Sequence, residues 1–134
     1  MPKRRPPFEI RVSHEARRDV GAILDWTEKE FGKRAALRYE ALLTQALRDV
    51  GEDPERPGSQ ARPEIAIEGV RTYHLEFSRG RVKGHGVKAP RHFLLYRSCE
   101  EGVIEVGRVI HDARDLQRHL PEDYRFSTHG EKPS

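Results

Sequence analysis

Two helical patterns separated by a single glycine constrain the fold of this chain most strongly. Apolar residues recur at spacings of three and four over residues 16–31 and again over residues 36–50, which is the period of a helix with one buried face. Ser13 stands where an N-cap belongs, and Gly32 can adopt the left-handed conformation in which helices commonly end. The sequence therefore predicts two helices that form an antiparallel hairpin.

Strand-like patterns flank this hairpin on both sides. They cover Phe8–Val12, Val70–Phe77, His92–Arg97 and Val103–Ile110, and the last two are joined by a short turn at residues 100–102. The last three strands predict an antiparallel meander. We therefore expect an α+β fold in the order β-α-α-β-β-β, with the helix hairpin packed on one face of a small, mostly antiparallel sheet. The apolar run at residues 93–96 predicts a central strand that is covered on both faces, or on one of them by a partner.

The length of 134 residues fits a single domain. We expect a basic N-terminal extension over residues 1–7, one domain over residues 8–120, with residues 51–63 as a surface connection, and a C-terminal tail over residues 121–134.

Hydrophobic residues make up 35% of the chain, below the roughly 45 to 50% of typical globular chains. The core should therefore be thin, and a partner should cover part of the apolar surface. Neither a signal peptide nor a membrane span is apparent, which predicts a cytoplasmic protein.

Several kinds of chemistry lose support from the sequence. The Gly-rich phosphate loops, the HExxH zinc motif and the GxSxG nucleophile motif do not occur in it, and Cys99 is the single cysteine. One thiol supplies neither an intramolecular disulfide nor a thiolate zinc cluster. We therefore expect no cofactor and no metal.

Positive charge is concentrated after the second predicted strand. Residues 79–98 contain six basic residues and no acidic one, although the net charge of the whole chain is only +3. The glycines at positions 80, 84 and 86 predict that residues 79–91 form a long, mobile hairpin loop. Its charge suits a phosphate backbone or an acidic segment of a protein partner, but a solvated loop tip explains it equally well.

Polar residues on the predicted strands suggest a second kind of site. If the strands pair as a meander, adjacent pairing can gather Arg71, His74, Arg97, His111 and Arg114, with Tyr96 and Tyr124 nearby. Such a cluster could cleave RNA without a metal, because His or Tyr moves protons and Arg stabilises the charge of the transition state. The alternative is structural: Arg71 and Arg97 form cross-strand pairs with Glu76 or Glu105, and His111 caps the last turn or forms a hydrogen bond with it.

Trp26 lies off the apolar face of its helix, where it either anchors an interface or packs under a loop.

The order of segments and several motifs resemble the RelE/ParE superfamily of toxins from type II toxin-antitoxin systems. The resemblance covers roughly residues 8–120. It is carried by SHEARRDVGAILDWTEKEFG, RYEALLTQAL, GVRTYHLEF, HFLLYR and, most specifically, VIEVGRVIHDARDL at Val103–Leu116, whose ending is similar to the HxxRDL ending of ParE-like toxins. Membership implies a cognate antitoxin that wraps the hairpin and sheet in a hetero-oligomer. ParE-like members poison DNA gyrase, whereas RelE-like members cleave mRNA in the ribosome, and the fold alone does not decide between them.

The resemblance favours the ParE branch. RelE-like chemistry relies on several basic residues of the middle strands and a C-terminal acid/base group, and here only Arg71, Arg97 and Tyr124 match, because Thr72–Leu75 supplies no lysine pair. We therefore expect a gyrase poison without an active site of its own. Its expected contacts with target or partner are Trp26, Arg81, Lys83, Lys88, Tyr96, Arg97 and Arg114.

Two alternatives stay open: a ribosome-dependent, metal-independent endoribonuclease that uses Arg71, Arg97 and either His111 or Tyr124, and a non-toxic module that binds an antitoxin. We expect the antitoxin to occupy an apolar strip around Phe93, Leu95 and Ile104 together with the basic loop, which is longer than the short turn usual in ParE members. The antitoxin family and the stoichiometry of the complex are left undetermined by the sequence.

Overall fold

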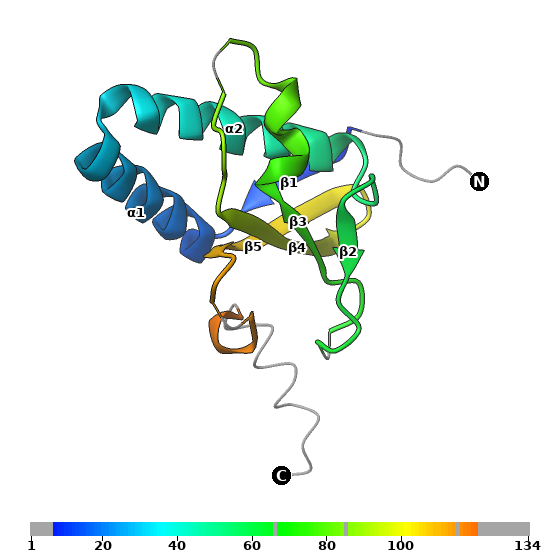
Figure 1. Cartoon of the computed structure of the whole chain (residues 1–134). Helices are drawn as coiled ribbons and strands as arrows, with labels where there is room; N and C mark the ends of the chain where they lie inside the picture. The colour runs from blue at the N-terminus through cyan, green and yellow to red at the C-terminus, as the bar shows by residue number, and fades with distance from the viewer. Residues whose placement is uncertain (1–6, 66, 85, 115, 121–134) are drawn as a thin grey trace.

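The computed structural model describes residues 7–65, 67–84, 86–114 and 116–120. The elements are β1 (Glu9–Val12), α1 (His14–Phe31), α2 (Lys33–Glu52), β2 (Ser59–Ala61), β3 (Arg71–His74), the 3-10 helix η1 (Leu75–Arg81), β4 (His92–Glu100), β5 (Val103–His111) and the 3-10 helix η2 (Leu116–His119) (Figure 1). The five strands form one sheet in the order β1-β5-β4-β3-β2. The predicted α+β class and the helix hairpin on a mostly antiparallel sheet are confirmed.

The helix hairpin forms where its capping residues predict it. The Ser13 hydroxyl accepts a hydrogen bond from the backbone N–H of Ala16, so it satisfies one of the free donors at the start of α1. Gly32 has a φ of 97° and donates its N–H to the carbonyl of Glu28, which ends α1 and allows α2 to begin one residue later. No helix in the described residues is both long enough and apolar enough to cross a membrane.

The sheet is antiparallel except at one edge. β3, β4 and β5 pair as the predicted meander, with Tyr73 opposite Leu94 and Leu94 opposite Val109. β1 adds to the outer side of β5 in parallel, which the two-helix crossover permits. β4 is thus the central strand, as its apolar run predicted.

Two local expectations were wrong. The strand expected over Val70–Phe77 ends at His74, where the His74 side chain accepts a hydrogen bond from the N–H of Glu76 and begins η1. The connection expected over residues 51–63 contains the short strand β2, which pairs with β3 through Ser59 and Tyr73. In both places side-chain hydrogen bonds, rather than an apolar period, determine the backbone.

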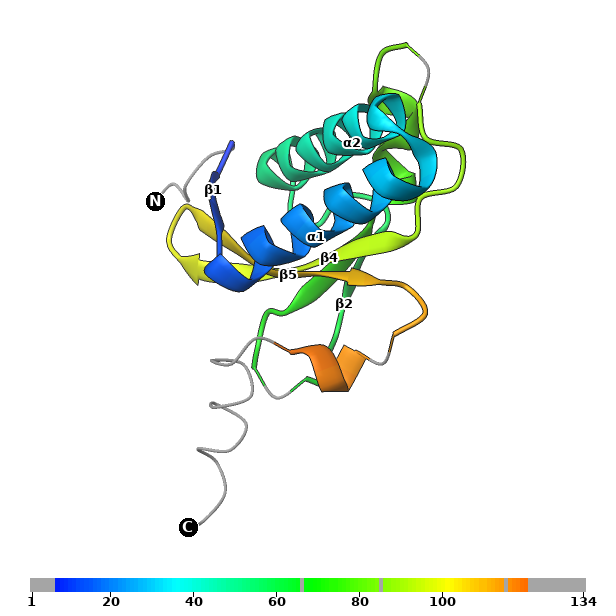
Figure 2. The ribbon, with the colours of Figure 1, turned by 90° about the vertical axis from the view of Figure 1, so that its left-hand side faces the viewer.

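Apolar clusters lie on both faces of the sheet. On the helix side, Leu94, Tyr96 and Val106 pack with the buried faces of α1 and α2. On the other side, Leu95 and Ile110 are covered by residues from the β2–β3 connection and from the C-terminal end, namely Ile65, Val70, Leu116 and Leu120. Figure 2 shows these layers, with the helices on one side of the sheet and η2 on the other.

The apolar strip that we expected to receive the antitoxin is therefore not exposed. Leu95 is 0% exposed and Ile104 is 2% exposed, while Phe93 is partly covered by the second cluster. Ile104 belongs to the cluster under the helices and not to the same face as Leu95. The chain fills both sides of its own central strand, so a partner has to bind elsewhere.

Candidate functional site: a groove at the tip of the helix hairpin

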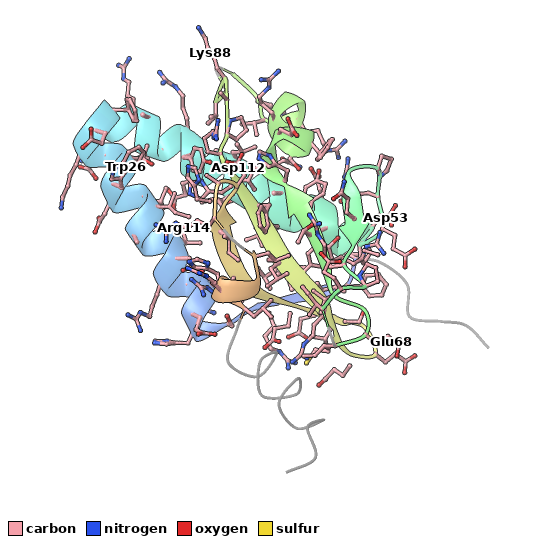
Figure 3. All side chains as sticks on the ribbon, turned by 60° about the horizontal axis from the view of Figure 1, so that its bottom comes forward. Trp26, Asp53, Glu68, Lys88, Asp112 and Arg114 are labelled. Carbon is pink, nitrogen blue, oxygen red and sulfur yellow. The ribbon has the colours of Figure 1, made fainter. Side chains whose placement is uncertain are left out.

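A hollow with a volume of about 1210 Å³ lies between the tip of the helix hairpin and the loop that precedes β4. One wall comes from the end of α1 and the start of α2, and the other from residues 84, 86–89 and 91. His92 at the start of β4 and His111 at the end of β5 lie at its base. We call it the hairpin-tip groove. Figure 3 labels Trp26 on α1 and Lys88 on the loop, on the side of the molecule away from Asp53 and Glu68.

The α1 wall carries an exposed aromatic pair. Trp26 is 57% exposed and Phe31 is 68% exposed, and their rings meet edge to face with centroids 5.6 Å apart. Of the two interpretations of Trp26, packing under a loop does not hold, because more than half of the side chain is accessible. Large exposed aromatic side chains that lie together are typical of interaction surfaces.

The other lining groups are basic or small. Arg34 and Arg38 lie one turn apart on α2, and Lys88 and Arg91 face them from the loop. Among the described residues that line the groove there is no carboxylate. The groove therefore combines aromatic surface with positive charge, a composition suited to an anionic partner that also has apolar groups.

A hydrogen-bonded chain holds the base of the groove. The Tyr39 hydroxyl accepts from the backbone N–H of Arg91 at 3.0 Å, which leaves its own proton to be donated to Nδ1 of His92 at 2.8 Å. His92 in turn stacks edge to face on His111, with ring centroids 5.2 Å apart. Burial and the neighbouring His111 lower the pKa of His92 to about 4, so this ring is neutral at physiological pH. Burial also raises the pKa of Tyr39.

Asp112 ties three basic groups together beside this base. Its carboxylate lies 3.0 Å from Nε2 of His74 and 3.0 Å from the Arg91 guanidinium, and His111 is 3.6 Å away. Burial alone would raise the pKa of Asp112, but the hydrogen bond from His74 and the charge of Arg91 outweigh it and lower the pKa below its ordinary value. Asp112 thus fixes the positions of β3, β4 and β5 where they meet the groove.

Two arginines at the start of the basic loop contact other parts of the chain. Arg79 donates to the carbonyl of Lys88, which closes the loop on itself. Arg81 donates to the carboxylate of Asp49 on α2 at 2.9 Å, and Asp49 is 0% exposed. Lys83 is exposed but does not line the groove, whereas Lys88 does. Of the three loop residues expected to contact a partner, Lys88 is placed for it, and Arg81 has a structural partner.

The residues proposed for RNA cleavage are not brought together. Arg71 donates to the Ser59 hydroxyl beside β2, and Arg97 faces Glu105 at 3.5 Å. His111 pairs with His92 of β4, and His92 is five residues from Arg97 on that strand. At roughly 3.3 Å per residue, His111 and Arg97 are therefore about 16 Å apart along the sheet. Tyr124 lies outside the described residues. The structural alternatives hold for two of these residues. Arg97 forms a cross-strand ion pair with Glu105, and Nδ1 of His111 accepts a hydrogen bond from Ala113 N–H in the turn after β5.

Two other expected contact residues occupy different surroundings. Tyr96 is 1% exposed, and its hydroxyl bonds with Ser59 and the carbonyl of Pro54, so it is not available to a partner in this structure. Arg114 is exposed and lies 3.4 Å from the ring of His119, beside a smaller hollow next to α1. Of the expected residues that the structure describes, only Trp26, Lys88 and His111 line the hairpin-tip groove.

Sequence reasoning missed most of the groove. Phe31, Arg34, Arg38, Tyr39 and His92 were not singled out. A usable signal existed for Phe31 and Arg34, because the residues around the glycine of a tight hairpin project at its tip. The pairing of Tyr39 with His92 joins residues 53 positions apart and has no local signal. In the described segments, no cluster of three or more His, Cys, Asp or Glu side chains is arranged to hold a metal ion.

Comparison with known proteins supports this architecture. A family model described as the ParE toxin of type II toxin-antitoxin systems, parDE, matches residues 10–116. Among solved structures, the chain is similar to one described as the chromosomal ParDE TA system from P. aeruginosa, with a TM-score of 0.54 and 16% sequence identity over 78% of this chain and 95% of that one. At this identity the likeness concerns the fold. No individually curated protein matches the sequence.

Proposed function

This chain belongs to the ParE toxin family of type II toxin-antitoxin systems, and we propose that it is a toxin that inhibits DNA gyrase and is neutralised by a cognate antitoxin. The family membership carries the toxin part of this proposal. The choice of target and the neutralisation are argued from the arrangement of the residues. Gyrase and the ribosome, the two targets of the superfamily, are both cytoplasmic, so the toxin acts in the cytoplasm.

One observation carries the preference for gyrase: the candidate ribonuclease residues that the structure describes lie far apart, whereas exposed aromatic and basic side chains lie together around one groove. Arg71 and Arg97 are held in structural contacts near the far end of the strands from His111. General acid-base catalysis requires its groups within hydrogen-bonding reach of one substrate, which this arrangement does not provide. A poison that acts by binding needs only a surface, and the hairpin-tip groove supplies one.

The mechanism we propose is therefore non-enzymatic. The toxin binds the topoisomerase and stabilises its cleaved DNA complex, so replication and growth stop although the toxin breaks no covalent bond itself. Trp and Arg contribute most of the binding free energy in many protein interfaces. Trp26 and the arginines of the α2 wall are accordingly the residues that we expect to contribute most to binding at this surface.

A titration of purified gyrase with this toxin tests the proposal. We expect loss of supercoiling and accumulation of cleaved DNA complexes as the toxin concentration rises into the micromolar range, and recovery of supercoiling when the antitoxin is added. No effect on gyrase, together with mRNA cleavage at the ribosomal A site in a translating extract, would replace the proposal by the ribonuclease alternative. Expression without antitoxin and without any growth defect would favour the non-toxic binding module.

A further inference from the structure

We infer that the hairpin-tip groove docks an acidic segment of the antitoxin that also carries an apolar side chain. The inference rests on the proposed function, since it assumes that an antitoxin exists, and it adds the place and the chemistry of binding. It also replaces the apolar strip around Leu95, which the chain covers with its own residues.

The apolar walls argue for a polypeptide. Trp26 and Phe31 present accessible rings on one side, and Val87 and Ala89 line the other. An apolar side chain inserted between them would remove these surfaces from water, which the free chain does not do. Nucleic-acid bases can also stack on exposed Trp and Phe rings, but the family of this chain pairs each toxin with a protein antitoxin. The partner is therefore a protein segment rather than a nucleic acid strand.

The charge of the walls argues for an acidic segment. Arg34 and Arg38 form no ion pair with the described part of the chain, in contrast to Arg81 and Arg108, which are bound to Asp49 and Asp19. Lys88 adds a third cation from the opposite wall. Charges left without an internal partner around one hollow attract a segment of opposite sign and determine how it is oriented.

The base of the groove supplies N–H donors for a carboxylate. Nδ1 of His92 accepts from the Tyr39 hydroxyl, and Nδ1 of His111 accepts from the N–H of Ala113. With Nδ1 occupied as an acceptor, each ring presents its N–H at Nε2, and both residues line the groove. Two N–H donors at the base and cations on the walls form an arrangement that recognises an Asp or Glu side chain.

The chain contains its own probe of this site, because Trp26 is its only tryptophan. Toxin labelled with 5-fluorotryptophan gives one ¹⁹F resonance, which reports on the groove even if the antitoxin contains tryptophan. The protein encoded beside the toxin gene is the titrant. We expect the resonance to shift and to lose its accessibility to a paramagnetic quencher as the complex forms.

Matched substitutions test the contacts. We expect Trp26→Ala to weaken the affinity for the antitoxin by about 30-fold or more, and Arg38→Glu by about tenfold with a weaker salt dependence. The controls are Leu37→Ala, an exposed apolar residue of the same hairpin, and Arg18→Glu, an exposed arginine of α1; neither lines the groove. Both should stay within about threefold of wild type, as expected for residues outside the interface.

The outcomes separate the inference from the proposed function. A complex that forms while the Trp26 resonance is unchanged, or in which the groove variants bind as tightly as their controls, would overturn the docking site and leave neutralisation intact. If wild-type toxin forms no complex at all, the proposed neutralisation fails and the docking site fails with it. A shifted resonance with selectively weakened groove variants supports both.

Discussion

Removal of the Asp49 carboxylate should destabilise the toxin more than any other single change to a polar side chain of α2. Asp49 is 0% exposed and accepts hydrogen bonds from Gln45 at 2.8 Å, Ser78 at 2.6 Å and Arg81 at 2.9 Å, with Arg56 at 3.6 Å. These groups come from α2, from the connection after it and from η1. The carboxylate thus holds η1 against the helix, and η1 leads into the loop that forms one wall of the groove.

The structure allows the size of the effect to be worked out. Truncating one partner of a buried ion pair costs about 3 to 5 kcal/mol, because it leaves the other charge buried and unpaired. Arg81 is about half exposed and can hydrate, whereas Arg56 is mostly covered. We therefore expect Asp49→Ala to cost about 3 kcal/mol, near the low end of that range. For a domain of this size that corresponds to a fall in Tm of roughly 10 °C.

Asp49→Asn tests the reason for the loss. The amide keeps the shape, and its N–H₂ can donate to the Ser78 hydroxyl if that hydroxyl turns its proton to Tyr73, 2.8 Å away. Only the charge is then lost, so the cost should be about 1 to 2 kcal/mol. The control is Glu52→Gln, which removes the same charge from an exposed site of α2 and should change stability by less than about 0.5 kcal/mol.

Urea unfolding followed by circular dichroism measures all three variants. The expected order of destabilisation is Asp49→Ala, then Asp49→Asn, then Glu52→Gln. The reasoning would be refuted if Asp49→Ala unfolded within about 1 kcal/mol of wild type, since a group with this burial and these partners cannot then be the anchor of η1. Equal losses for Ala and Asn would show that charge, rather than the hydrogen bonds, accounts for the stabilisation.

Three further outcomes are expected. Burial lowers the pKa of His92 from 6.5 to about 4 in the folded protein, so between these pH values only the unfolded chain binds a proton at this residue. The free energy of unfolding should therefore be unaffected by His92 above pH 6.5 and should fall as the pH drops from 6.5 to about 4. Urea midpoints against pH should show a shallower fall for His92→Asn, and an unchanged slope would contradict the assignment. Arg108→Lys loses the two-point contact with Asp19 and should cost about 1 to 2 kcal/mol in urea unfolding; a neutral effect would contradict its role in joining α1 to β5. Tyr96→Phe should cost about 1 to 2 kcal/mol by the same measurement, because it removes the buried hydrogen bonds of the Tyr96 hydroxyl with Ser59 and the Pro54 carbonyl, but antitoxin affinity should not change. A loss of affinity without a loss of stability would show that Tyr96 contacts the antitoxin.

The main elements could be predicted because their signals are local. The Ser13 cap and the positive φ of Gly32 act within one turn of the residues they organise, so the hairpin follows from the sequence. The elements that were missed depend on distant partners. The 3-10 helix η1, which follows β3 in place of further strand, is held against α2 by the bond between Ser78 and Asp49, 29 positions away, and no apolar period records that contact.

The site was less predictable than the fold for the same reason. Trp26 and Lys88 stood out as an aromatic off the apolar stripe and a cation in a basic loop, and both line the groove. Their proximity depends on the hairpin angle and on the Arg79 contact that closes the loop, neither of which spacing reveals. Charge was misleading at Arg81, because a basic residue in a loop looks the same in sequence whether it is free or paired with a buried carboxylate.

Some basic residues form ion pairs within the fold and others do not, and this difference determines where positive charge is left for a partner. Arg81 and Arg108 are neutralised by Asp49 and Asp19, and these pairs attach η1 and β5 to the helices. In the hairpin-tip groove the described lining residues include no carboxylate, and Arg34 and Arg38 form no ion pair with the described part of the chain. A net charge of +3 would be a weak field if it were spread over the surface. In the groove, Arg34, Arg38 and Lys88 lie beside the exposed rings of Trp26 and Phe31 and make this surface locally positive. An acidic partner with an apolar side chain complements both the charge and the rings.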